Sequence, residues 1–119
     1  MLSLPASIRI YLATAPVDLR KSIDGLGALA GTRGHDLFAG HLFLFTSRRG
    51  DRVKILWWDR GGFVLYYKRL ERGRFRLPEL TPGAEEVQLD GTQLAMLLDG
   101  IDVRRVPPPT RWTPTAAKK

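Results

Sequence analysis

The residues best suited to chemistry in this 119-residue chain are cations and aromatics concentrated in residues 47–76. That stretch holds ten Lys or Arg and three acids, whereas the rest of the chain has nine of each, so the whole formal charge of +7 lies there. Six of the eleven aromatic residues lie there too. Arginine and lysine bind phosphates through charge, and flat aromatic faces stack on exposed bases. The pattern predicts a surface that faces a polyanion, with a solvated face or a protein interface as the alternatives.

The aromatic residues have a second interpretation, because aromatics are favoured in strands and dominate small cores. Adjacent strand residues point to opposite faces. At least one of Trp57 and Trp58 is therefore expected to be exposed, unless a helix or the tail residue Trp112 covers the second face. The predicted DNA-binding residues are Arg48, Arg49, Arg52, Lys54, Lys68, Arg69, Arg72 and Arg74, and the predicted stacking or partner contacts are Trp57, Trp58, Tyr66 and Tyr67.

Residue types argue against most catalytic and metal sites. The chain has no cysteine, which excludes disulfides, thiol nucleophiles and Cys-ligated zinc. Two histidines are too few for a His-rich metal site, and the acids are scattered rather than clustered as a two-metal nuclease requires. The sequence thus predicts no metal, no cofactor and no catalytic residue. One enzymatic alternative remains, a metal-independent ribonuclease that would use Lys54, Tyr66, Tyr67, Lys68 and Arg69.

Composition indicates a single globular domain, since 44% of the residues are apolar and 26% are charged. The longest apolar runs are far shorter than the roughly 20 residues that cross a bilayer. Residues 1–7 lack a basic region followed by a long apolar stretch, so no signal peptide is expected. We expect a cytoplasmic protein, nucleoid-associated when bound to DNA, with one domain over residues 1–106. Residues 107–119 are expected to form an extended tail rich in proline and lysine.

Strands and turns must position the cations and aromatics. Three strand-like runs, 41–46, 52–58 and 63–70, are joined by short turns and predict an antiparallel meander, because parallel neighbours need a crossover of a dozen or more residues. Asp18 is expected to cap the first helix, and Asp90 or Thr92 the second. The elements outside the meander are predicted as a strand over 7–14, a helix over 19–30, a strand over 85–89 and a helix over 93–98.

The predicted fold class is therefore α+β: an antiparallel β-meander with an N-terminal strand and two helices in a single compact domain. Both helices are expected to cover one face of the sheet. The other face is then left to carry much of the basic and aromatic surface.

Three segments in order, Ile10–Leu26, Gly40–Asp59 and Tyr67–Phe75, resemble the small accessory protein of a large class of bacterial insertion sequences. This TnpB-type protein is not the RNA-guided nuclease that shares the label. The stretch Arg-Gly-Asp-Arg-x-Lys-Ile-Leu-Trp-Trp-Asp at Arg49–Asp59 and the segment Lys68–Phe75 are long enough to be specific. In such elements the protein is encoded beside a separate, much larger transposase. The resemblance implies that the acidic active site lies on that transposase and that this chain supplies no catalytic residue.

The residues and the resemblance together predict a non-catalytic accessory protein for DNA transposition. It is expected to bind DNA through a basic and aromatic sheet surface and to assist the separately encoded transposase. The expected partners are thus DNA and the transposase, and no membrane. The alternative from another class is an adaptor that docks on the transposase through Trp57, Trp58 and Tyr66 and never touches DNA.

Overall fold

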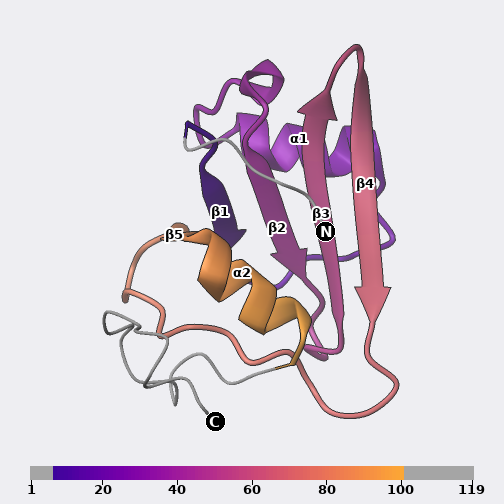
Figure 1. The fold of residues 1–119 in the computed structure, drawn as a ribbon, viewed down its shortest axis with the longest axis vertical. Helices are drawn as coiled ribbons and strands as arrows, with labels where there is room; N and C mark the ends of the chain where they lie inside the picture. The colour runs from indigo at the N-terminus through magenta and orange to yellow at the C-terminus, as the bar shows by residue number, and fades with distance from the viewer. Residues whose placement is uncertain (1–6, 101–119) are drawn as a thin grey trace, which may run out of the picture.

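Five strands form one sheet, in the order β4-β3-β2-β1-β5, in the computed structural model, which describes residues 7–100 (Figure 1). Strands β2, β3 and β4 pair antiparallel through short turns, which confirms the predicted meander. Strand β1 pairs parallel with β2, and the chain between them is long enough for the crossover that this requires. The strands are β1 (Ile10–Ala13), β2 (Leu42–Thr46), β3 (Arg52–Asp59), β4 (Gly62–Arg69) and β5 (Glu86–Leu89).

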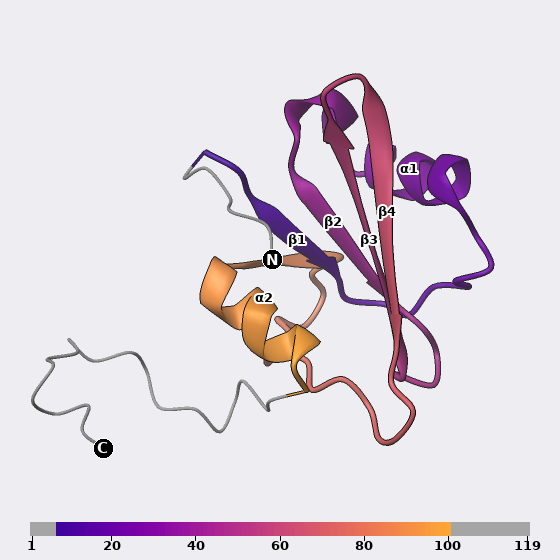
Figure 2. The same ribbon diagram turned by 45° about the vertical axis from the view of Figure 1, so that its right-hand side comes forward.

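Helices α1 (Ile23–Gly31) and α2 (Gly91–Leu98) lie on opposite faces of the sheet (Figure 2). Leu44 of β2 packs in the same cluster as Leu97 of α2, whereas its neighbour Phe45 packs with Leu26 of α1. The expectation that both helices cover one face is therefore wrong. All five residues of β2 are buried, as is typical of a strand that is covered on both sides, so each face needs a cover of its own.

The start of α1 also differs from the prediction. The chain forms a turn at Asp18, whose carboxylate accepts a hydrogen bond from the Arg20 backbone N–H at 3.0 Å. The residue at the helix N-cap is Ser22, and its side chain makes no capping bond. Asp90 does cap α2, in a reciprocal capping box with Gln93. Neither helix, nor the short 3₁₀ turn η1 (Leu37–Ala39), is long and apolar enough among the described residues to cross a membrane.

The two ends of the sheet have different turns. At one end the β3–β4 hairpin closes through Arg60 and Gly61, whose positive φ angles of 42° and 89° are typical of the tight turn that matches strand twist. At the other end the turn between β2 and β3 runs through Gly50, with φ of 81°. The cations flank this second turn, so the end of the sheet that holds it is called the basic end below.

Three segments meet at the basic end. The chain after β1 is held beside β2 by a 2.9 Å bond from the Val17 N–H to the Thr46 carbonyl. The chain after β4 returns to the β2–β3 turn, where the Phe75 N–H donates to the Gly50 carbonyl at 2.7 Å. The Phe75 ring is only 5% exposed and belongs to the core on the α2 side. A buried ring and a backbone bond thus fix the loop after β4. The predicted tail over 107–119 and Trp112 lie outside the described residues.

Candidate nucleic-acid interface

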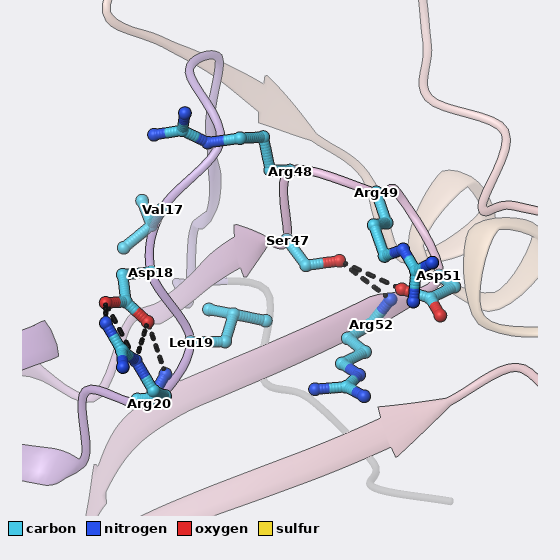
Figure 3. Close-up of a pocket in the computed structure, with 9 residues that line it drawn as sticks. All are labelled: Val17, Asp18, Leu19, Arg20, Ser47, Arg48, Arg49, Asp51 and Arg52. Carbon is cyan, nitrogen blue, oxygen red and sulfur yellow. Dashed lines mark hydrogen bonds and ion pairs between the residues drawn. The ribbon is translucent and has the colours of Figure 1, made fainter.

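An arginine-lined cleft of about 490 Å³ opens at the basic end (Figure 3). One wall is the turn after β1, and the other is the β2–β3 turn together with the first residue of β3. The apolar part of the lining comes from Val17 and Leu19. Its charged lining consists of Arg20, Arg48, Arg49, Arg52, Asp18 and Asp51.

Both aspartates of the cleft are engaged locally. Asp18 forms an ion pair with Arg20 at 2.7 Å, and the hydrogen bonds from Arg20 hold the pKa of Asp18 well below its usual range. Asp51 accepts a 3.3 Å hydrogen bond from the Ser47 hydroxyl within the turn. Among residues 7–100, no acid forms an ion pair with Arg48, Arg49 or Arg52, the other three arginines of the cleft. The cleft therefore retains unneutralised positive charge at Arg48, Arg49 and Arg52.

The surroundings of Arg52 would favour a bound anion. Its Nε is buried and has no hydrogen-bond partner in the described part of the chain. It lies directly opposite Arg69 on β4, and like charges at opposed positions destabilise an antiparallel pair. Arg69 is partnered by Glu71 at 3.1 Å. A bound anion would offset the repulsion between Arg52 and Arg69, and local costs of this kind are expected at functional sites.

The loop after β4 brings two more of the predicted cations to the basic end. The Arg74 side chain lies against Gly50, within 3.5 Å of where a Cβ would stand on that glycine. With Arg48 and Arg49 it lines a second, smaller cleft of about 200 Å³. Arg72 and Arg74 are both exposed. The positive surface thus continues from the cleft onto this loop.

Two of the predicted cations are engaged elsewhere. The Lys54 ammonium donates to the Lys21 carbonyl at 3.0 Å and lies 5.2 Å from the centroid of the Tyr67 ring. The Lys68 ammonium donates to the Leu98 carbonyl at the C-terminal end of α2. That position suits a cation, because the helix dipole is negative there. Both lysines therefore have structural partners, and Lys68 lies on the face away from the cleft.

The residues considered for a ribonuclease do not meet at one point. Side chains alternate along β4, so Tyr67 and Arg69 point to the α1 face and Tyr66 and Lys68 to the α2 face. Lys54 faces Tyr67. Within residues 7–100, no three acids or histidines are grouped so that they could hold a metal ion.

Trp57 and Trp58 are both half-buried, on opposite faces of the sheet, so the expectation that one is exposed is wrong. Trp57 packs against the core on the α2 side. Trp58 makes edge-to-face contacts with Phe38 and Phe63, at centroid distances of 4.9 and 5.1 Å. Both side chains are half-buried because other elements pack on each face of the sheet. The exposed large aromatics in the described part are Phe38 (63%), Tyr66 (37%) and Tyr67 (50%).

Because both tryptophans pack, Trp57→Ala and Trp58→Ala are each expected to lower the free energy of unfolding by about 2–3 kcal/mol, below the 3–5 kcal/mol typical of fully buried rings. Urea unfolding followed by circular dichroism measures this, with Tyr67→Ala as the exposed aromatic control. A neutral result for either tryptophan would show that its face is open after all.

Arg20 is the cleft residue that sequence reasoning missed. The sequence pattern predicts a helix over residues 19–30 with Asp18 as its cap, which places Arg20 on a helix surface. An Asp two residues before an Arg is also compatible with a turn in which the carboxylate accepts from the following backbone N–H, as occurs here. That turn directs Arg20 into the cleft lining.

Comparison with known proteins identifies the family of the chain. A family model described as IS66 Orf2-like protein matches residues 8–108. The chain is 37% identical over 100 residues to the uncharacterized protein y4jC of Sinorhizobium fredii, covering 83% of this chain and 84% of that one. It is 35% identical over 116 residues to the uncharacterized protein y4hO of the same organism, covering 97% of each. No solved structure matches the chain. The chain therefore belongs to the family of IS66 Orf2-like proteins, small accessory proteins of the IS66 insertion sequences.

Proposed function

We propose that the arginine cleft binds the phosphate backbone of DNA, and that the protein assists a separately encoded transposase in this way. The observation that carries the proposal is the state of Arg48, Arg49 and Arg52. They line one open cleft and have no ion-pair partner among the described residues, and Arg52 also lies opposite the like charge of Arg69. Family membership supports the role in transposition.

The residue types suit phosphate better than a nucleobase. Every cation that lines the cleft is arginine, whose planar fork of donors matches two phosphate oxygens at once. No aromatic residue lines the cleft. Phe38 is on η1 and Tyr66 points to the α2 face, whereas Tyr67 is on the face of the cleft but lies against the Lys54 ammonium. Phosphate contacts position a protein on DNA and carry little sequence information. The proposed binding is therefore largely independent of DNA sequence.

Binding to duplex DNA is expected to weaken steeply with salt. If the five arginines at positions 48, 49, 52, 72 and 74 each neutralise a phosphate, the slope of log K against log salt concentration is about −5. A gel-shift titration at several salt concentrations measures it, with duplex, single-stranded and RNA probes side by side. An affinity that is constant from roughly 50 to 300 mM salt would contradict the proposal. Cleavage of the RNA probe would instead favour the ribonuclease.

A second function, docking on the transposase without DNA contact, is favoured by the aromatic cluster at the other end of the sheet. Phe38 is 63% exposed and stands edge-on against Trp58. A docking surface centred there would include Phe63 but not Trp57, which lies on the opposite face. Loss of transposase binding in Phe38→Ser, with no gel shift on any probe in the wild type, would support this function over the first.

A further inference from the structure

The outer edge of β4 has no paired strand within residues 7–100. β4 stands at one border of the sheet and pairs on one side only, with β3, among the described residues (Figure 1). It has eight residues, whereas β5 at the other border has four and begins with Glu86. Proteins usually protect edge strands with charges, proline, bulges or short length. From Gly62 to Tyr67, β4 has none of these, and its register with β3 is unbroken.

The pattern of hydrogen bonds identifies which residues are free to pair outward. The Leu70 N–H donates to the Asp51 carbonyl across the β3–β4 ladder. Residues that face the neighbouring strand alternate along an antiparallel ladder. The even-numbered residues of β4 therefore bond to β3. The N–H and C=O groups of Phe63, Leu65, Tyr67 and Arg69 point to the open edge.

We propose that this edge pairs antiparallel with the same edge of a second copy of the chain, with the two-fold axis at Tyr66. In this register Leu65 lies opposite Tyr67 of the second copy, and Phe63 opposite Arg69. All four outward-facing residues then exchange hydrogen bonds. The two sheets become one, and the interface is isologous, as in most symmetric dimers.

The sequence of β4 is complementary to itself when reversed, which selects a second copy as the occupant. The first part of the strand is apolar and aromatic, and its last two residues are Lys68 and Arg69. Antiparallel pairing about Tyr66 places Lys68 opposite Val64, and the guanidinium of Arg69 beside the ring of Phe63. No like charges face each other, whereas a two-fold axis at Lys68 would oppose two ammonium groups. The exposed Tyr66 rings meet at the axis.

A single cysteine at the axis tests the register, because the chain has no cysteine of its own. Tyr66→Cys is expected to form a disulfide-linked dimer under mild oxidation without DNA, since opposed residues of antiparallel strands have Cβ atoms roughly 5 Å apart. Val64→Cys is the matched control on the same face of the strand. Its two copies would stand about 14 Å apart, beyond disulfide reach. Equal crosslinking of both variants, or of neither, would overturn the proposal.

Charge at position 64 gives a second test without crosslinking. Val64 is half-buried and belongs to neither core cluster, so the variants are expected to fold. In Val64→Glu, the new carboxylate would attract the ammonium group of Lys68 in the second copy. In Val64→Lys, two ammonium groups would repel each other at the same place. Each contact occurs twice in the dimer. The dimer dissociation constant, measured by sedimentation equilibrium, is expected to be about tenfold lower for the Glu variant than for the Lys variant. A folded wild-type monomer at every concentration reached, or equal constants for the two variants, would show that the edge does not bind a second copy.

Discussion

Replacing Arg48 and Arg49 together by glutamine is expected to weaken duplex DNA binding about 60-fold at roughly 0.1 M salt, and adding Arg52→Gln to bring the loss to about 500-fold. Each phosphate contact contributes about 0.9 to the salt slope, which corresponds to about eightfold in affinity at that concentration. The slope should fall by about 2 in the double variant and about 3 in the triple one. Gel-shift titrations on unrelated duplexes measure both quantities, and the loss should be similar for all of them.

The matched control removes two arginines from the opposite end of the sheet. Arg9 precedes β1, and Arg60 lies in the β3–β4 hairpin, so Arg9→Gln with Arg60→Asn changes the net charge by the same amount as the cleft double. Asparagine suits position 60, where φ is 42°. This control is expected to lose less than about threefold in affinity, through the general field alone. An equal loss of affinity in the two double variants would mean that DNA binding depends on the net charge of the protein rather than on the cleft.

The meander and its basic turns could be predicted from the sequence because their causes are local. Short Gly-containing turns between apolar runs permit only antiparallel neighbours. The cations stand in those turns, so Arg48 and Arg49 reach the surface whatever covers the sheet. The capping box of Asp90 and Gln93 is local as well. These features need no knowledge of the rest of the chain.

The placement of the helices depends on long-range contacts, and there the sequence interpretation failed. Four consecutive large apolar residues, Leu42–Phe45, are typical of a strand buried on both faces. At β2, therefore, neither face of the sheet is free to be a binding surface. The arginines of the cleft lie at the basic end of the sheet, and both tryptophans are half-buried. The prediction that Asp18 caps α1 is wrong because a helix cap and a turn use the same bond from a backbone N–H to a carboxylate.

Phe75→Ala is expected to lower the free energy of unfolding by about 3–5 kcal/mol, a large part of the roughly 5–15 kcal/mol of an ordinary domain. The ring is 5% exposed and packs in the core beneath α2, so its removal leaves a cavity. Phe75→Leu keeps most of the apolar volume and should cost about half as much or less. Urea unfolding curves give both values, and a cost of Phe75→Ala below about 1 kcal/mol would contradict the packing described here.

The Phe75 ring also anchors the loop that carries Arg72 and Arg74, so its removal is expected to lower the affinity for DNA. In Phe75→Ala the loop retains the backbone bond to Gly50 and the partly buried Leu70 and Leu77 on either side, but it loses its buried ring. At a temperature where the variant is still folded, its affinity is expected to fall toward that of Arg72→Gln/Arg74→Gln, at most about 60-fold below the wild type. Leu89→Ala separates this effect from instability, because Leu89 is buried in the same cluster but lies on β5, away from the loop. That variant should lose stability and keep its DNA affinity. If Leu89→Ala weakens DNA binding as much as Phe75→Ala does, the loop is not specifically anchored by the ring, and the effect of Phe75 on DNA is only its contribution to the fold.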